Sequence, residues 1–178
     1  AKKIIKREDF KEYEKDLKSS LIKVITGPRR AGKSTLALQL LQDKNFAYLN
    51  FDDERLISLK TEDLNKVLQA IYEIYKKPKF IFFDEIQNTS GWELFVNRLK
   101  RQGFNLVITG SNAKLLSTEL ASHLTGRHIS LELYPFSFRE YLAFNNILYL
   151  KDIFTTQEIG SLKRRLKNYL ELGGFPEI

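Results

Sequence analysis

The sequence predicts an α/β fold in which a mainly parallel sheet is covered by helices on both faces. Three observations support this prediction. Five short apolar or β-rich runs occur along the 178 residues, and segments with helical periodicity lie between them. The first run leads directly into a glycine-containing loop that ends in Lys33 and Ser34. Strands and helices that alternate in this way form βαβ units, whose strands pair in parallel.

The predicted strands differ in their apolar pattern. The first and third are almost continuously apolar, which predicts central strands buried on both faces. The last one alternates, with Ile129, Leu131 and Leu133 on one side, and this predicts an edge strand with one face in water. The five strands are expected at residues 21–25, 46–51, 80–83, 105–109 and 128–134.

Apolar residues at helical spacing predict the helices between these strands. One helix should open directly after the glycine-containing loop. The only tryptophan, Trp92, lies on an apolar stripe and is expected in the core. The other internal stripes are Leu64, Val67, Leu68, Ile71, Ile74 and Tyr75; Trp92, Phe95, Val96 and Leu99; and Leu116, Leu120 and Leu124.

A helical segment is expected after the last strand. Thr155 and Glu158 have the spacing of a capping box, which predicts a helix near Thr155–Leu172. Its apolar stripe consists of Ile159, Leu162, Leu166, Tyr169 and Leu170.

Residues 27–34 match the phosphate-loop (Walker A) pattern G-x-x-x-x-G-K-S/T. Because this loop follows a buried strand and opens a helix, its N–H groups and the positive helix end converge on one anion. Lys33 is expected to reach the β- and γ-phosphates, and the Ser34 hydroxyl to ligate Mg²⁺. The residues predicted to bind the nucleotide are Gly27, Pro28, Arg29, Arg30, Ala31, Gly32, Lys33, Ser34 and Thr35.

Two of these residues, Arg29 and Arg30, have no role that the sequence assigns. The variable positions of such a loop contribute backbone, so their side chains are expected in solvent or in a structural ion pair. Contact with a partner is the alternative.

Residues 80–85, FIFFDE, form an apolar strand that ends in two acids, in the manner of a Walker B motif. Asp84 is placed to hold Mg²⁺, and Glu85 to orient and deprotonate an attacking water. A solvated acidic turn is the alternative for an isolated acid pair, but the phosphate loop favours the catalytic interpretation. A water-activating glutamate indicates hydrolysis rather than the phosphoryl transfer of a nucleotide kinase.

The run NLVITGSN places Ser111 and Asn112 at the end of a further strand. Either side chain is predicted to sense the γ-phosphate if this strand lies between those that carry Lys33 and Asp84. The alternative is that one of them caps the helix that follows.

The motifs GPRRAGKST, FIFFDEIQ, VITGSN and LTGRHISLELYPFSFREYL together resemble P-loop ATPases of the AAA+ superfamily. Within it, the chain looks like the prokaryotic and archaeal ATP-binding proteins. The resemblance implies a three-layer P-loop NTPase sandwich whose parallel five-stranded sheet has the order 5-1-4-3-2. It also implies an ATPase core at residues 1–134, a helical extension at 135–178, and further domains beyond Ile178.

The same resemblance identifies Arg127 with the family's arginine finger, which reaches the γ-phosphate of a neighbouring subunit. A homo-oligomer with Arg127 acting in trans is therefore expected. The structural alternative is an arginine that caps the preceding helix after Gly126.

Composition restricts the class of protein. The net charge of +7 favours an anionic partner such as a nucleotide, nucleic acid or an acidic protein face. Cysteine is absent, which excludes disulfides and thiolate metal sites and fits a reducing compartment. We see neither a membrane span nor a signal peptide in the sequence, so a cytoplasmic protein with no membrane partner is expected.

These observations predict a Mg²⁺-dependent ATPase. Lys33, Glu85, Ser111, Asn112 and Arg127 are its expected catalytic residues. Its metal ligands are expected to be Ser34 and Asp84, and its cofactors ATP and Mg²⁺. The alternative function is a nucleotide-dependent switch with little turnover that regulates a nucleic-acid or protein partner.

Overall fold

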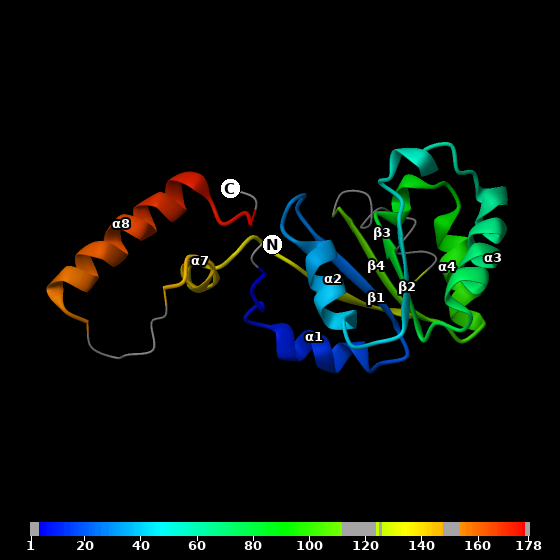
Figure 1. Cartoon of the computed structure of the whole chain (residues 1–178), viewed down its shortest axis with the longest axis horizontal. Helices are drawn as coiled ribbons and strands as arrows, with labels where there is room; N and C mark the ends of the chain where they lie inside the picture. Colours follow the sequence, from blue (N-terminus) through cyan, green and yellow to red (C-terminus); the bar gives the residue numbers. More distant parts are fainter. Residues whose placement is uncertain (1–3, 112–123, 125, 148–153, 177–178) are drawn as a thin grey trace.

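A computed structural model of the chain describes residues 4–111, 124, 126–147 and 154–176. These residues form an all-parallel five-stranded sheet flanked by helices on both faces (Figure 1). The strand order β2-β3-β4-β1-β5 confirms the predicted arrangement. The strands are β1 (Ile22–Gly27), β2 (Phe46–Asn50), β3 (Phe80–Asp84), β4 (Asn105–Ser111) and β5 (His128–Glu132).

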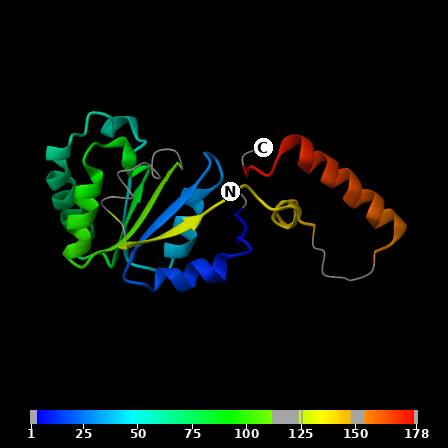
Figure 2. The same ribbon diagram turned by 180° about the vertical axis from the view of Figure 1, so that it is seen from behind.

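Four helices of the described chain pack on the sheet, two on each face. Figures 1 and 2 show α1 and α2 on one face, and α3 and α4 on the other. The helix expected around Leu116 and Leu120 falls outside the described residues, although Leu124 is described and is fully buried. The four helices are α1 (Phe10–Leu17), α2 (Lys33–Leu41), α3 (Leu64–Tyr75) and α4 (Trp92–Arg101).

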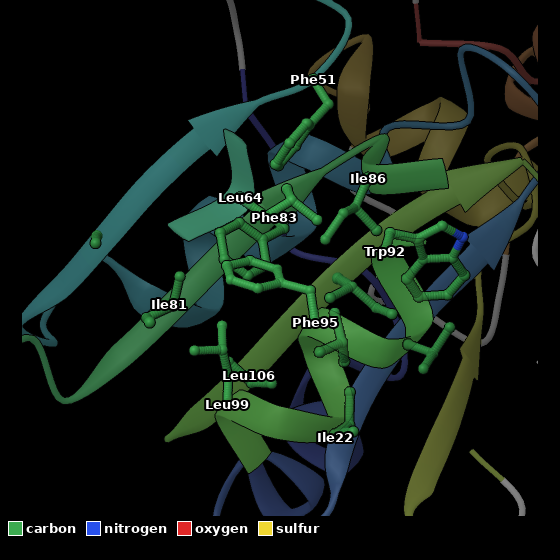
Figure 3. Packing of buried hydrophobic residues seen from close by; sticks show 14 of the residues in the cluster. Ile22, Phe51, Leu64, Ile81, Phe83, Ile86, Trp92, Phe95, Leu99 and Leu106 are labelled. Atoms are coloured by element: carbon green, nitrogen blue, oxygen red, sulfur yellow. The ribbon is translucent and has the colours of Figure 1, made fainter. Parts of the chain in front are cut away.

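The larger apolar cluster fills the space between the sheet and helices α3 and α4 (Figure 3). Trp92 and Phe95 of α4 are 4% and 3% exposed, which confirms the prediction that Trp92 belongs to the core. Phe83 of β3 packs its ring against Phe95 with a centroid separation of 5.7 Å. Burial of these side chains holds α4 against the sheet.

A second apolar cluster lies on the opposite face, under α1 and α2. Successive residues of β3 point to opposite faces of the sheet. Phe82 belongs to the cluster under α1 and α2, and Phe83 to the cluster under α3 and α4. Both β1 and β3 are buried along their whole length, as predicted for central strands. The edge strand β5 buries Leu131 and exposes Ser130 and Glu132, also as predicted.

Lys23, the second residue of β1, is a charged residue within this core. Its side chain is fully buried, and its ammonium donates a hydrogen bond to the carbonyl oxygen of Ser19. Burial, followed by repulsion from Lys100, lowers the pKa of Lys23 from 10.5 to about 8. Its charged form therefore destabilises the folded chain at neutral pH.

Replacing Lys23 by methionine is expected to raise the free energy of unfolding at pH 7 by roughly 3–4 kcal/mol, since the pKa falls from 10.5 to about 8 and one pKa unit corresponds to about 1.4 kcal/mol. The folded wild type loses the Lys23 proton near pH 8, but the unfolded chain keeps it to pH 10.5. Wild-type stability should thus rise toward that of Lys23→Met across this window. Urea unfolding measures both effects, with the exposed Lys11→Met as control; a constant difference would contradict the assignment.

The segment after β5 carries α7 (Phe138–Phe144) and α8 (Thr156–Leu172), which extend away from the sheet (Figures 1 and 2). The predicted capping box of Thr155 and Glu158 is present at the start of α8. The end of the segment returns to the connection after β5, where the Tyr169 hydroxyl donates to the carbonyl oxygen of Phe136 at 2.7 Å. Across the described ranges, every helix is too short or too polar to cross a bilayer.

Candidate nucleotide-binding site

The phosphate loop joins β1 to α2 at the carboxyl edge of the sheet. Gly27 has φ 148°, and a Cβ on it would lie 2.0 Å from the carbonyl oxygen of Leu133. Gly32 is the N-cap of α2 and has φ 95°. Both positions are strained or blocked for a residue with a side chain, which explains the two glycines of the motif.

Lys33 is the first residue of α2, and its side chain is 5% exposed. Its ammonium donates to the carbonyl oxygens of Gly27 and Pro28, both at 3.2 Å. The same nitrogen lies 3.6 Å from Oε1 of Glu85. Lys33 therefore folds back over the loop and links it to the acid pair.

Asp84 ends β3 and receives hydrogen bonds from hydroxyl groups of three different elements. Ser34 Oγ donates to Oδ1 at 2.9 Å, the Tyr48 hydroxyl donates to Oδ2 at 3.2 Å, and Thr109 also donates to Oδ1. Partial burial, and then the Asp84 carboxylate, raise the pKa of Tyr48 to about 12, so it remains a donor at neutral pH. These bonds fix the orientation of the carboxylate.

Ser34 and Asp84 meet the chemical requirements of a magnesium site. Mg²⁺ prefers oxygen ligands and in nucleotide sites uses one or two protein groups together with phosphates and water. The oxygens of Ser34 and Asp84 lie 2.9 Å apart, and Asp84 is only 4% exposed. This donor set fits the ion.

Glu85 lies directly beyond β3 in a left-handed backbone conformation, with φ 53° and ψ 40°. Such a conformation costs a non-glycine residue on the order of 1–3 kcal/mol. The Glu85 amide donates to Oγ1 of Thr109 at 3.1 Å, and the Gln87 side-chain amide donates to Oε2 of Glu85. Thr109, Gln87 and Lys33 thus hold the backbone and the carboxylate of Glu85.

A cavity of about 850 Å³ lies over the loop and the acid pair. Gly32, Lys33, Ser34, Asp84 and Glu85 form its polar part. Arg29, Arg30 and Thr35 also line it, and these three residues are exposed. Its apolar part comes from the N-terminal segment and from the chain after β5, and consists of Ile4, Ile5, Phe136, Phe144 and Pro176.

Two predicted residues lie at or beyond the end of β4. The backbone of Ser111 ends this strand and pairs with Gly27, so it lies beside the phosphate loop. The strand runs between β1 and β3, as the sensor hypothesis requires. Asn112 lies outside the described residues.

Arg127 lies at the opposite edge of the sheet from the phosphate loop. It precedes β5, and its carbonyl oxygen accepts from the amide of Ile22 at the start of β1. Its guanidinium donates to Oδ1 of Asn97 at 3.3 Å. The structure therefore does not bring Arg127 together with the other predicted residues of its own chain.

Sequence reasoning missed Tyr48, Thr109 and Gln87. Tyr48 lies two residues before Asn50, the β2 residue paired with Asp84, and the order of strands was needed to place it. Thr109 is a hydroxyl residue inside an otherwise apolar run, and this was a usable signal. Gln87 follows Glu85 by two residues, but only the turn of the backbone at Glu85 brings its amide back to the carboxylate.

Comparisons with known proteins identify the family of the chain. The sequence model described as an AAA domain matches residues 19–142. An uncharacterized protein of Methanocaldococcus jannaschii is 44% identical over 160 residues, covering 88% of this chain and 36% of that protein. An uncharacterized protein of Haemophilus influenzae is 34% identical over 190 residues, covering 100% of this chain and 45% of that protein. The chain spans less than half the length of these curated relatives.

A solved structure supports the fold. The Walker-type ATPase of Pyrococcus abyssi matches with a TM-score of 0.61 and 17% identity, covering 97% of this chain and 65% of that one. At this identity the match supports the fold alone, whereas the family match extends over most of the present chain. The chain belongs to the AAA family of P-loop ATPases.

Proposed function

We propose that this domain binds ATP with Mg²⁺ and hydrolyses it, so as to drive or gate a partner. The observation that carries the proposal is the meeting of the phosphate loop and the acid pair. Ser34 bonds Asp84 at 2.9 Å, and Lys33 lies 3.6 Å from Glu85. A phosphate-binding loop, a metal-binding carboxylate and a candidate base therefore line one cavity.

Each residue has a separate role in this proposal. The loop N–H groups and Lys33 bind the phosphates. Ser34 and Asp84 would hold Mg²⁺, which neutralises charge that develops on the phosphate oxygens. Glu85 orients the attacking water and accepts its proton. A phosphate that binds Lys33 also competes with Glu85 for the same ammonium, and this links substrate binding to release of the base.

The apolar part of the cavity suits the base of the nucleotide. Ile4 and Ile5 from the N-terminal segment, and Phe136 and Phe144 from the segment after β5, offer apolar contact. The base would thus lie between the N-terminal segment and the segment after β5, with the triphosphate over the loop. The choice of ATP as the nucleotide rests on the family resemblance, since apolar contact does not distinguish adenine from guanine.

Roles are also proposed for three residues outside the phosphate loop and the acid pair. Ser111 and Asn112 are proposed as sensors of the γ-phosphate, which the position of β4 supports. Arg127 is proposed to act in trans on a second copy, because it lies far from its own phosphate loop. We further propose that residues 1–134 form the ATPase core and residues 135–178 a helical extension. The extension would change its contact with the partner according to whether nucleotide is bound.

A switch with little turnover is the second candidate function, and one observation favours it. The Glu85 carboxylate contacts Lys33 and Gln87, and in this alternative the two contacts persist when nucleotide binds and keep it from acting as a base. In this alternative, nucleotide binding alone changes how the domain meets a nucleic-acid or protein partner. ATP binding without phosphate release would identify it.

Phosphate release from ATP is expected to depend on Mg²⁺. Chelating Mg²⁺ with EDTA should lower turnover by about 100-fold, since the ion contributes several kcal/mol of charge stabilisation. Ser34→Ala should lower it by about tenfold by removing one ligand while Asp84 remains. The exposed Ser90→Ala is the control, and Mg²⁺-independent turnover would contradict the proposal.

A further inference from the structure

Arg7 bridges the phosphate loop and the segment after β5. Its side chain is only 9% exposed. Nη1 donates to the carbonyl oxygen of Ala31 at 3.1 Å, inside the phosphate loop. Nη2 donates to the carbonyl oxygen of Tyr134, and Nε donates to Oε1 of Glu140 at 2.9 Å. Nη2 also donates to the carbonyl oxygen of Pro135 at 3.4 Å. The planar fork of arginine thus serves four acceptors from two parts of the chain.

Glu140 holds the other end of this arrangement, and its side chain is 7% exposed. Its Oε1 also accepts from the amide of Glu8 at 2.8 Å, while Oε2 accepts from the amide of Ser137 at 2.9 Å. The Ser137 hydroxyl accepts in turn from the Glu140 amide at 3.1 Å, which completes a capping box. One carboxylate therefore fixes both the start of α7 and the guanidinium of Arg7.

The contact with Ala31 affects the part of the loop that faces the phosphates. The carbonyl of Ala31 and the N–H of Gly32 belong to one planar trans peptide, so they point in opposite directions. Fixing the carbonyl on Arg7 consequently fixes the direction of the Gly32 N–H, and Gly32 lines the cavity. Arg7 lines this cavity as well, and its Nη1 is engaged by the Ala31 carbonyl.

We infer that Arg7 is a positioning residue of the phosphate loop, and that its ion pair with Glu140 couples nucleotide binding to the docking of α7. The inference rests on the proposed nucleotide binding. It adds a residue outside the sequence motifs and a contact that connects the phosphate loop to α7. Coupling is reciprocal. A nucleotide that orders the loop must therefore stabilise α7, and loss of the ion pair must weaken nucleotide binding.

The N-terminal segment and α7 also provide a matched control pair. Arg139 of α7 lies 4.0 Å from Glu8, but its side chain is 89% exposed. This pair joins the same two segments without touching the phosphate loop. Exposed pairs of this kind contribute little, because solvent screens them.

The test compares Arg7→Lys with Arg139→Lys in the whole chain, using a fluorescent non-hydrolysable ATP analogue with Mg²⁺. Lysine keeps the charge of Arg7 but lacks the planar fork that serves several acceptors at once. Arg7→Lys is expected to weaken binding by about tenfold, within the range of typical coupling. KM for ATP should rise by a similar factor while kcat changes little, and Arg139→Lys should match the wild type.

Hydrogen exchange separates positioning from general destabilisation. Without nucleotide, amides of residues 29–33 and 138–144 should both exchange faster in Arg7→Lys than in Arg139→Lys. With the analogue, exchange in α7 should slow in the wild type but not in Arg7→Lys. Glu140→Gln should reproduce both results, which keeps the test decisive if Arg7→Lys does not fold.

Two results would overturn the inference. One is analogue binding by Arg7→Lys within about twofold of the wild type, well below typical coupling. The other is exchange in α7 that the Arg7 substitution leaves unchanged without nucleotide. A wild type that fails to bind the analogue would instead overturn the proposed function, and exchange without nucleotide would still decide the position of Arg7.

Discussion

Glu85→Gln is expected to lower kcat for ATP hydrolysis by about 100- to 1,000-fold, the usual contribution of a positioned general base. Glutamine has nearly the same shape but cannot accept the proton of the attacking water. The affinity for ATP should stay within roughly threefold, since the substitution removes an interaction used mainly in the transition state. Phosphate release and equilibrium binding measured on the same preparation check the two parts separately.

The exposed Glu54→Gln is the matched control for this substitution, because it removes an equal charge outside the cavity. It should leave both kcat and affinity unchanged. Equal turnover by Glu85→Gln and the wild type would exclude Glu85 as the base. A large loss of affinity would instead show that Glu85 acts mainly by holding Lys33.

Gly27→Ala is expected to lower the free energy of unfolding by on the order of 4 kcal/mol, from backbone strain and a steric clash together. The φ of 148° disfavours alanine, and its Cβ would meet the carbonyl oxygen of Leu133 at 2.0 Å. Relief of this clash must move either the loop or the chain beyond β5. ATP binding should therefore be lost as well, and chemical unfolding together with analogue binding measures both.

Two other glycines separate these contributions. Gly103 has φ 89° with no atom within 4 Å of the added Cβ, so Gly103→Ala tests strain alone. Gly160 lies inside α8, also without a near neighbour, and Gly160→Ala should stabilise the helix by about 1 kcal/mol. The expected order of stability is Gly160→Ala, wild type, Gly103→Ala and then Gly27→Ala. A Gly27→Ala protein as stable as Gly103→Ala would contradict the clash.

Most of the fold was accessible from the sequence because its strands carry distinct local signals. Continuous apolar runs at β1 and β3 and alternation at β5 reflect burial on two faces or one. The order of the strands was not encoded locally and came from the family resemblance. Lys23 departs from these patterns: a lysine inside a central strand looks like an interruption, yet its side chain is fully buried.

The candidate site was predictable where adjacent residues in the chain define it. Gly27, Gly32, Lys33 and Ser34 form a contiguous motif, and a strand that ends in Asp84 is easily recognised. Contacts between distant segments were not predictable in this way. Tyr48 reaches Asp84 only because β2 pairs with β3.

Arg7 is the clearest example of a residue hidden from sequence reasoning. It is one of several charged residues in a polar N-terminal stretch, so its spacing carries no signal. Its acceptors lie 24, 127, 128 and 133 positions away along the chain. Only folding brings these acceptors together.

The position of Arg127 restricts the symmetry of any assembly in which it reaches a phosphate. The five residues of β5 separate it from the carboxyl edge of the sheet by about 17 Å, at roughly 3.3 Å per residue. Two copies that exchange this contact must then use different surfaces, the amino edge of one sheet and the carboxyl edge of the next. Such head-to-tail contacts are heterologous and build rings or open filaments, whereas a twofold dimer would have to place both edges in one interface.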